Sequence, residues 1–585
     1  MKKYILSFVS CLILSFSFAQ GKILEKDMLN TNSNSTNQKG KINLIHSDFI
    51  DRNETEVPGA IVYAGNIQVE HNGANIFCNK AYYFHEEEYI KAFGNVRITQ
   101  GDTINMTSQY AEYDGKTERA FATGNVQMSS PDSQLVTDTI RLDRKIQQAY
   151  YNSYGTITNK DNILKSKSGR YYINQKKYAF KTAVTVVNPK STIKTNNLDF
   201  YDNSGHAYVY GPSTIISKTD TINTTNGFYD TKNHVAKLKG KSNIKYNNRT
   251  IEGDLIDYDR KKNFAFAKNN VKITDTVNNM IARGHYAEIY RNIGGTKKDS
   301  MFITKKALVS TLVDKKTNDS LHLHGKRILV TGAPEDRTIR AFNNVRFIKS
   351  DMSGKCDSIH SNNKNALTKL IGRPVIWSQD SQMTGDEIHL IGNNKTEQLD
   401  SLKVLNNAFL IQKDTIGNGF NQVKGQFLYG KLKDNKLYEV DLVKNTEKIY
   451  YMYDENNDLV GIDKGVSSKI NMKLENNQIV EITSFVNPES ETYPEEKYPE
   501  NARKLRGFIW RNDEKIKSKE DIFPPEELAL DEKVQEDKKK NEKAEAKPMD
   551  VLKETLNYDK NKKKDDKKVS EKQSTKKETT KKVKK

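Results

Sequence analysis

"AFATGNVQM", residues 120–128, has the composition of a β-strand but carries Gly124 and Asn125 at its centre. Gly weakens a strand interior unless a bend or bulge is needed there, because it packs no side chain and loses the most backbone entropy on ordering. The same pattern returns along the chain as "YAGNIQV" from 63, "KAFGNVRI" from 91, "VYGPSTI" from 209, "KLKGKSNI" from 237, "FAKNNVKI" from 266, "AFNNVRFI" from 341 and "VLNNAFLI" from 404. The chain is therefore a repeat protein.

The repeats have a period of about 29 residues, as from Gly65 to Gly94 or from Gly211 to Gly240. The register lapses at 275–335 and at 380–400, where longer loops are expected. Each unit has the pattern of a hairpin: an outgoing strand such as "TSQYAEYD", a turn that begins with Asp, and a returning strand with the central Gly or Asn. Helical periodicity is absent and β-branched and aromatic residues dominate, so the sequence predicts an all-β solenoid of hairpin repeats.

Alternate residues of a strand face opposite sides of the sheet, so each returning strand has one face that can be identified. The face that includes the central Gly or Asn is apolar, whereas the other carries residues such as Lys91, Arg97, Gln127 and Lys268. The predicted inward residues are Ile61, Tyr63, Ile67, Val69, Ile90, Ala92, Val96, Ile98, Ala120, Ala122, Val126, Met128, Ala207, Val209, Ile215, Ala265, Ala267, Val271, Ile273, Ile339, Ala341, Val345 and Phe347.

Gly and Asn are the residues that most readily adopt a positive φ, so each returning strand is expected to bend at its centre. A bend that recurs in register folds the whole sheet lengthwise into a trough or flattened tube with an apolar interior. An ordinary dry solenoid core would show the same apolar columns, because most such columns are packing.

Composition shifts divide the chain into five parts. Residues 1–19 are typical of a cleaved secretory signal, and Cys11 only faintly suggests a lipoprotein box. Residues 20–40 form a polar linker, 41–490 the repeat domain, 491–523 a possible end cap and 524–585 a disordered, charged, Lys-rich tail. No later stretch approaches the ~18 to 20 apolar residues of a membrane helix.

A net charge of +19 in an exported chain favours anionic glycans, phosphates and lipid headgroups over nucleic acid, although charge also serves solubility. Cys78 and Cys356 lie many repeats apart, farther than a disulfide can span in a stacked sheet, so two free thiols are expected.

No catalytic or metal-binding motif is apparent. His322 and His324 in "LHLHGK" share one strand face but have no third ligand nearby, and Glu86, Glu87 and Glu88 have the pattern of a solvated turn. A P-loop, a GxSxG and a CxxC are absent. The sequence predicts neither an enzyme nor a cofactor.

The recurring AxGNV strands, the "DTI" and "YD" turns and the exported apolar column resemble the OstA-like family of lipopolysaccharide-transport proteins over residues 41–490. The resemblance implies an elongated β-taco or β-jellyroll. It also implies that the inward column holds the acyl chains of lipopolysaccharide or a related glycolipid. By the same resemblance, the protein would be a periplasmic, non-enzymatic lipid bridge or chaperone that serves the outer membrane. It would meet other trough proteins at the inner and outer membranes and could associate end to end with itself. The chain is longer than the short bridging members and lacks the C-terminal membrane strands of a translocon.

Two rival interpretations stay open. An exported β-solenoid adhesin or glycan-binding structural protein would have a sealed core and outward aromatic or polar ladders. A β-helix polysaccharide lyase would cluster carboxylates or basic residues on one outer face.

Overall fold

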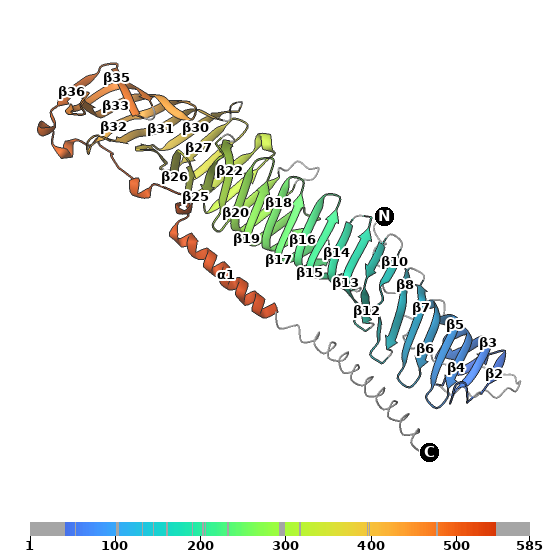
Figure 1. The fold of residues 1–585 in the computed structure, drawn as a ribbon. Coiled ribbons are helices and arrows are strands. Elements are labelled where there is room, and N and C mark those ends of the chain that lie inside the picture. Colours follow the sequence, from blue (N-terminus) through green and yellow to red (C-terminus); the bar gives the residue numbers. More distant parts are fainter. Residues whose placement is uncertain are drawn as a thin grey trace, which may run out of the picture. The chain divides into compact units, whose positions relative to one another are not determined.

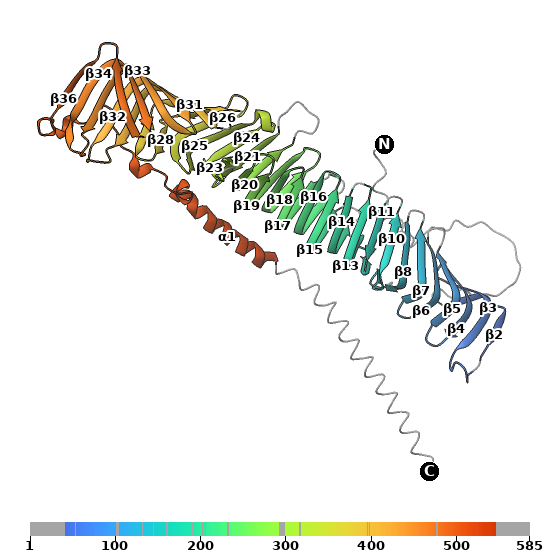
Figure 2. The ribbon, with the colours of Figure 1, turned by 45° about the horizontal axis from the view of Figure 1, so that its top comes forward.

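The computed structural model describes residues 41–545 apart from 53, 101–103, 131–132, 144, 160–161, 173, 190, 202–203, 205, 231–232, 234, 292–298, 315–316, 395, 397 and 476–477. One antiparallel sheet of 36 strands dominates the first of two units, residues 1–522 and 523–585, and its hairpins follow one another along the sheet (Figures 1 and 2). The predicted all-β fold of stacked hairpin repeats is confirmed. The predicted signal and linker lie outside the described residues.

Twenty long strands carry the repeat, in the two alternating sets that the sequence predicts. The returning strands are β3 (Ile61–His71), β5 (Tyr89–Gln100), β7 (Arg119–Ser130), β13 (Lys177–Asn188), β15 (His206–Ser217), β17 (Val235–Tyr246), β19 (Phe264–Asp275), β25 (Thr338–Lys349), β31 (Gln398–Lys413) and β33 (Lys436–Tyr453). The outgoing strands are β4 (Ala74–Phe84), β6 (Ile104–Asp114), β8 (Ser133–Asp143), β14 (Ser191–Tyr201), β16 (Asp220–Asp230), β18 (Arg249–Asp259), β20 (Met280–Tyr290), β26 (Met352–Asn362), β32 (Phe420–Lys433) and β34 (Leu459–Glu475).

Elsewhere one strand is divided into two short ones. These pairs are β1 (Asn43–His46) with β2 (Phe49–Asp51), β9 (Gln148–Tyr151) with β10 (Gly155–Asn159), β11 (Asn162–Ser166) with β12 (Ser168–Tyr172), β21 (Ser300–Thr304) with β22 (Leu308–Asp314), β23 (Asp319–His324) with β24 (Arg327–Thr331), β27 (Leu367–Ile371) with β28 (Val375–Ser378), β29 (Ser381–Thr384) with β30 (Glu387–Asn393), and β35 (Gln478–Phe485) with β36 (Glu489–Tyr493). Short 3-10 turns are η2 (Pro334–Asp336), η3 (Glu495–Lys497), η4 (Glu500–Ala502), η5 (Asn512–Glu514) and η6 (Glu520–Ile522).

The Gly-Asn pairs form the corner of each returning strand. Gly124 and Asn125 have φ angles of 83° and 52°. The pairing of β7 with β8 steps from Thr123 to Val126 while its partner moves only from Thr139 to Thr137, so two residues oppose one. This is a β-bulge, which bends the bulged strand. The same register shift recurs along the sheet, as at 65–66, 94–95, 269–270, 343–344 and 406–407, where both residues have positive φ.

The line of corners divides the sheet into two walls. We call wall A the part of each returning strand before its corner, such as residues 119–123, and wall B the part after it, such as 126–130, each with the outgoing residues that it pairs with. The turns that end each wall form its rim, and the gap between the two rims is the mouth. Side chains from both walls meet in shared hydrophobic clusters, so the interior lies between the walls.

The segment 494–522 runs back along the outer face of wall B, whereas the sequence predicts an end cap here. The side-chain amide of Gln422 donates to the carbonyl of Arg503 (2.8 Å), and that of Gln382 donates to the carbonyl of Ile509 (2.7 Å). Leu505 packs with outward apolar residues such as Phe409 in a separate cluster. These strands carry apolar residues on both faces, so their outer face also needs a cover. We call residues 494–522, which provide this cover, the strap.

Helix α1 (Pro525–Glu545) occupies the first part of the predicted disordered tail, so that prediction is wrong for these residues. Pro525 begins the helix, Glu526 and Glu527 lie in its first turn, and Glu, Lys, Ala and Leu supply good helix formers. Residues 546–585 lie outside the described part of the chain. Among the described residues, no helix is both long and apolar enough to cross a membrane.

Candidate functional site

The predicted inward residues line the space between the walls, but they are not equally enclosed. The buried ones are Tyr63, Ile67, Val69, Ile90, Ala92, Val96, Ala122, Val126, Ala207, Val209, Ala265, Ala267, Val271, Ile273, Ala341, Val345 and Phe347. The partly exposed ones are Ile61, Ile98, Ala120, Met128, Ile215 and Ile339.

The second inward residue after each corner is a consistent probe of how open the mouth is, because it occupies the same place in every repeat. Five consecutive members of this series are partly exposed: Ile98, Met128, Ile157, Val186 and Ile215. The members on either side are buried, namely Val69 (1%), then Ile244 (3%), Ile273 (2%), Val309 (2%), Phe347 (4%), Ile376 (7%) and Leu410 (4%). The apolar interior is therefore accessible over residues 98–215, the open segment, and enclosed over residues 244–410, the closed segment.

Small side chains lie beside the corner at the base of the interior. Ala81, Ala92, Ala111 and Ala122 pair across neighbouring strands of wall A and are each at most 4% exposed. Ala81 and Ala111 belong to outgoing strands, which the predicted column omits together with Ile76, Cys78, Tyr83, Met106 and Tyr113. The sequence pattern could have predicted these inward residues, since "TSQYAEYD" has the same two-residue alternation as the returning strands.

At the N-terminal end the walls touch. The rings of His71, at the rim of wall B, and Tyr113, in wall A, have centroids 5.2 Å apart. Tyr63 and Tyr83 stack in the same cluster with centroids 6.3 Å apart, and burial raises the pKa of both phenols. The contact between His71 and Tyr113 joins the two walls at the N-terminal end of the open segment.

The other residues that the sequence singled out have structural partners. His322 Nδ1 lies 2.8 Å from Ser310 Oγ, and His324 Nδ1 lies 2.8 Å from the carbonyl of Ala307. No group of three or more potential metal ligands occurs in the part of the chain that the structure describes. Glu86 and Glu87 are exposed in the turn after β4.

The expectation of two free thiols is confirmed, since Cys78 and Cys356 are unpaired and buried. Burial raises the pKa of the Cys78 thiol to about 11 and that of Cys356 to about 12.

Comparison with known proteins places a family resemblance on the N-terminal part of this sheet. Residues 39–196 match the model of the family described as OstA-like protein, which confirms the predicted resemblance for that segment. Among solved structures, 14 chains match. One of them is LptH, the LptA-homologous periplasmic component of the lipopolysaccharide transport device of Pseudomonas aeruginosa. It is 14% identical, with a TM-score of 0.17, and the alignment covers 18% of this chain and 81% of LptH. No curated protein matches the chain.

Proposed function

We propose that the protein binds the acyl chains of lipopolysaccharide or a related glycolipid between walls A and B, and carries it toward the outer membrane as a non-enzymatic bridge or chaperone. The observation that carries the proposal is the run of partly exposed apolar side chains from Ile98 to Ile215. Most of this run falls inside the OstA-like segment, residues 39–196. An apolar line that water can reach is expensive to leave empty and suits a lipid ligand.

The proposal ranks the predicted lipid-contacting residues by whether they lie in the open or the closed segment. Ile98, Met128 and Ile215 become the strongest candidates, with Ala92 and Ala122 at the base beneath them. Ala267 and Ala341 are fully buried in the closed segment, where packing explains them without a ligand.

Site-specific photo-crosslinking tests the function directly. A photoreactive residue at Met128 should capture glycolipid in cells, whereas the same residue at the adjacent outward Gln127 should not, because neighbouring residues of a strand face opposite sides. Equal capture at Met128 and Gln127, or glycan captured only at Gln127, would refute the proposal.

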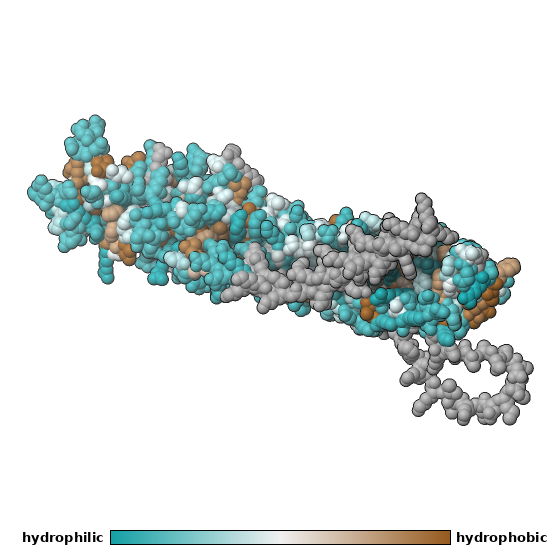
Figure 3. All heavy atoms as spheres, turned by 60° about the horizontal axis from the view of Figure 1, so that its bottom comes forward, coloured by the Kyte–Doolittle hydropathy of each residue, from teal (hydrophilic) through white to brown (hydrophobic). Residues whose placement is uncertain are grey.

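The unpaired outer edge at the start of the sheet suits a partner of the same architecture. Among the described strands, β1 and β2 pair only with β3. Ile45, Phe49 and Ile50 are 56%, 71% and 63% exposed there. One of the hydrophobic patches in Figure 3 lies at the end of the sheet that the first strands occupy. We propose that this edge accepts a strand of another trough protein of the transport route, in the periplasm or at the outer membrane, or of a second copy.

A glycan-binding role is the second candidate, because the outer face of wall A carries an aromatic ladder. Phe93 lies between Tyr82 and Tyr110, with ring centroids 4.9 Å away on both sides, and Lys80 Nζ lies 4.9 Å from the centre of the Tyr82 ring. Cross-strand aromatic pairs also stabilise a sheet by themselves. Binding of soluble polysaccharide that Phe93→Ala abolishes would favour this candidate.

A further inference from the structure

The boundary between the open and closed segments coincides with a cluster of charged side chains that joins the two rims. Arg249 begins β18 and Asp275 ends β19, both at the rim of wall B. Asp299 precedes β21 and Arg337 precedes β25, both at the rim of wall A. Arg249 and Asp275 face each other on the paired strands β18 and β19, whereas Asp299 and Arg337 come from later hairpins and meet them because the walls close upon each other here.

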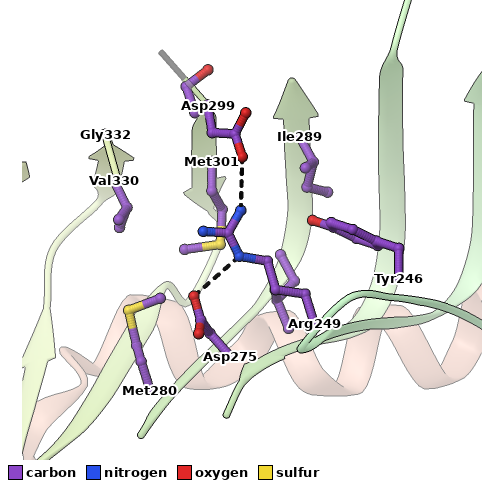
Figure 4. Close-up of a pocket in the computed structure, with 11 residues that line it drawn as sticks. Tyr246, Arg249, Asp275, Met280, Ile289, Asp299, Met301, Val330 and Gly332 are labelled. Atoms are coloured by element: carbon purple, nitrogen blue, oxygen red, sulfur yellow. Dashed lines mark hydrogen bonds and ion pairs between the residues drawn. The ribbon is translucent and has the colours of Figure 1, made fainter. Parts of the chain in front are cut away.

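Three contacts cross the mouth at this place. Arg249 donates one guanidinium bond to Asp275 beside it (3.0 Å) and reaches Asp299 on the opposite rim (3.3 Å), as Figure 4 shows. Arg337 reaches back from wall A to Asp275 (3.4 Å). The guanidinium of Arg291, at the rim of wall A, lies 4.3 Å from the ring centre of Tyr246, at the rim of wall B.

The central pair is removed from water, unlike an ordinary surface ion pair. The side chains of Asp275 and Arg337 are 2% and 3% exposed. Asn278 also donates to Asp275, at 2.7 Å. Breaking such a pair leaves a buried charge without its partner, so the rims are held together firmly as long as all members are present.

Apolar side chains of both walls lie directly beneath the charges. Ile273 and Met280 come from wall B, and Ile289, Met301 and Val330 come from wall A. They line a partly open pocket of ≈ 20 Å³, which has room for about one water molecule and none for an acyl chain. The charged cluster therefore closes the mouth over an interior that is filled by side chains alone.

We propose that Arg249, Asp275, Asp299 and Arg337 form a latch that marks the end of the lipid-binding part of the trough. This inference rests on the proposed function. Acyl chains occupy the open segment, and they pass residue 244 only when the latch opens and the rims separate. The latch thus confines the ligand to residues 98–215 in the closed state of the protein.

Photo-crosslinking at two inward positions tests the latch. The full-length protein carries the photoreactive residue at Met128 in the open segment or at Val309 in the closed one, and is mixed with purified lipopolysaccharide. We expect capture at Met128 and at least about tenfold less at Val309. The neutral variant Arg249→Gln, Asp275→Asn, Arg337→Gln should raise capture at Val309 several-fold and leave Met128 unchanged.

The matched control is Arg119→Gln with Asp143→Asn. That Arg–Asp pair has a similar length (2.9 Å) but joins neighbouring strands along the rim of wall A without crossing the mouth. It should leave both positions unchanged. Equal capture at Met128 and Val309 in the unaltered latch, or no response to the neutral variant, would overturn the latch and leave the lipid function standing. Absence of capture at both positions would instead overturn the lipid function.

A distance measurement keeps the inference testable if the neutral variant does not fold. Spin labels at Asn248→Cys and Lys262→Cys, exposed on opposite rims, report the width of the mouth when Cys78 and Cys356 are replaced by Ala. With an intact latch, lipopolysaccharide that is captured only at Met128 should leave the distance between the two spin labels unchanged. When lipopolysaccharide is also captured at Val309, the distance between the labels should be longer. Capture at Val309 without a change in distance would contradict the latch.

Discussion

The corner of the sheet can be tested by adding one methyl group at Gly124. This residue has a φ of 83°, and a Cβ placed there would lie 2.7 Å from the Cβ of Gln109 on β6. Gly211 occupies the equivalent corner with a φ of 79°, yet an added Cβ meets nothing within 4 Å. Comparison of the two Gly→Ala variants therefore separates the cost of the backbone conformation from the cost of the clash.

The expected free-energy costs follow from these two positions. A left-handed conformation costs an Ala about 1–2 kcal/mol, and the reduced entropy of the unfolded chain returns about 0.4–1 kcal/mol. Gly211→Ala should thus lose about 1 kcal/mol of stability. Gly124→Ala pushes on a Cβ that cannot rotate away, which adds about 1–3 kcal/mol of overpacking, so its total should be about 2–4 kcal/mol.

Hydrogen exchange is the suitable assay, because a stacked sheet opens locally and a single global unfolding energy is not defined for it. The amides of β6 and β7 report on Gly124→Ala, and those of β14 and β15 report on Gly211→Ala. Adding Gln109→Gly should restore most of the loss at Gly124, whereas Gln109→Ala should not, since it keeps the Cβ. Equal losses at both glycines, or no rescue by Gln109→Gly, would refute this account of the corner.

Three further predictions concern the latch, the thiols and the strap. Burial alone would raise the pKa of Asp275, but Asn278 and the two arginines outweigh it and lower the pKa below its ordinary value. The carboxylate therefore stabilises the fold above about pH 4, and this contribution is lost as the pH falls through the folded pKa, so exchange of β19 amides should accelerate in acid much less in Asp275→Asn than in the parent. Cys78 and Cys356 should resist maleimide at pH 8 until denaturant is added, because burial raises both thiol pKa values, and rapid native-state labelling would contradict their burial. Gln422→Ala removes bonds to the backbone of both Arg503 and Leu505 and should weaken the strap by about 1–3 kcal/mol, visible as faster proteolysis within 494–522.

Local rules made the corners predictable. Gly-Asn and Asn-Asn pairs favour positive φ by themselves, so the bend, the two-residue alternation and the inward column of each repeat could be derived before any contact between distant residues was known. Asn66 and Asn270 further support their corners by donating to Asp48, between β1 and β2, and to Asp254 on β18.

The closure of the mouth depends on contacts that no local pattern specifies. Arg249 and Arg337 are 88 positions apart, and only the facing of the two rims brings them to one carboxylate. The sequence does contain an indication of the strap. Phe409, Leu410 and Ile411 are consecutive apolar residues, which a strand with one solvated face should not have, so this run indicates a cover on the outer face that the two-residue alternation does not predict. Helix α1 was missed because a charged composition was interpreted as disorder, although its Glu, Lys and Ala are good helix formers.

The dimensions of the open segment bear on how a lipid would lie in it. Wall B of β7 has about five residues between the corner and the rim, which at ~3.4 Å per residue gives a depth of roughly 17 Å. Half of the ~30 Å hydrocarbon core of a bilayer is about 15 Å, the span of one layer of acyl chains. Chains inserted from the mouth toward the small side chains of Ala92 and Ala122 would thus be covered over their whole length, with the headgroup outside the rims. The headgroup must then travel along the mouth while the chains move inside, so a contact that ties the two rims together blocks both at once, and the latch is placed where it can do so.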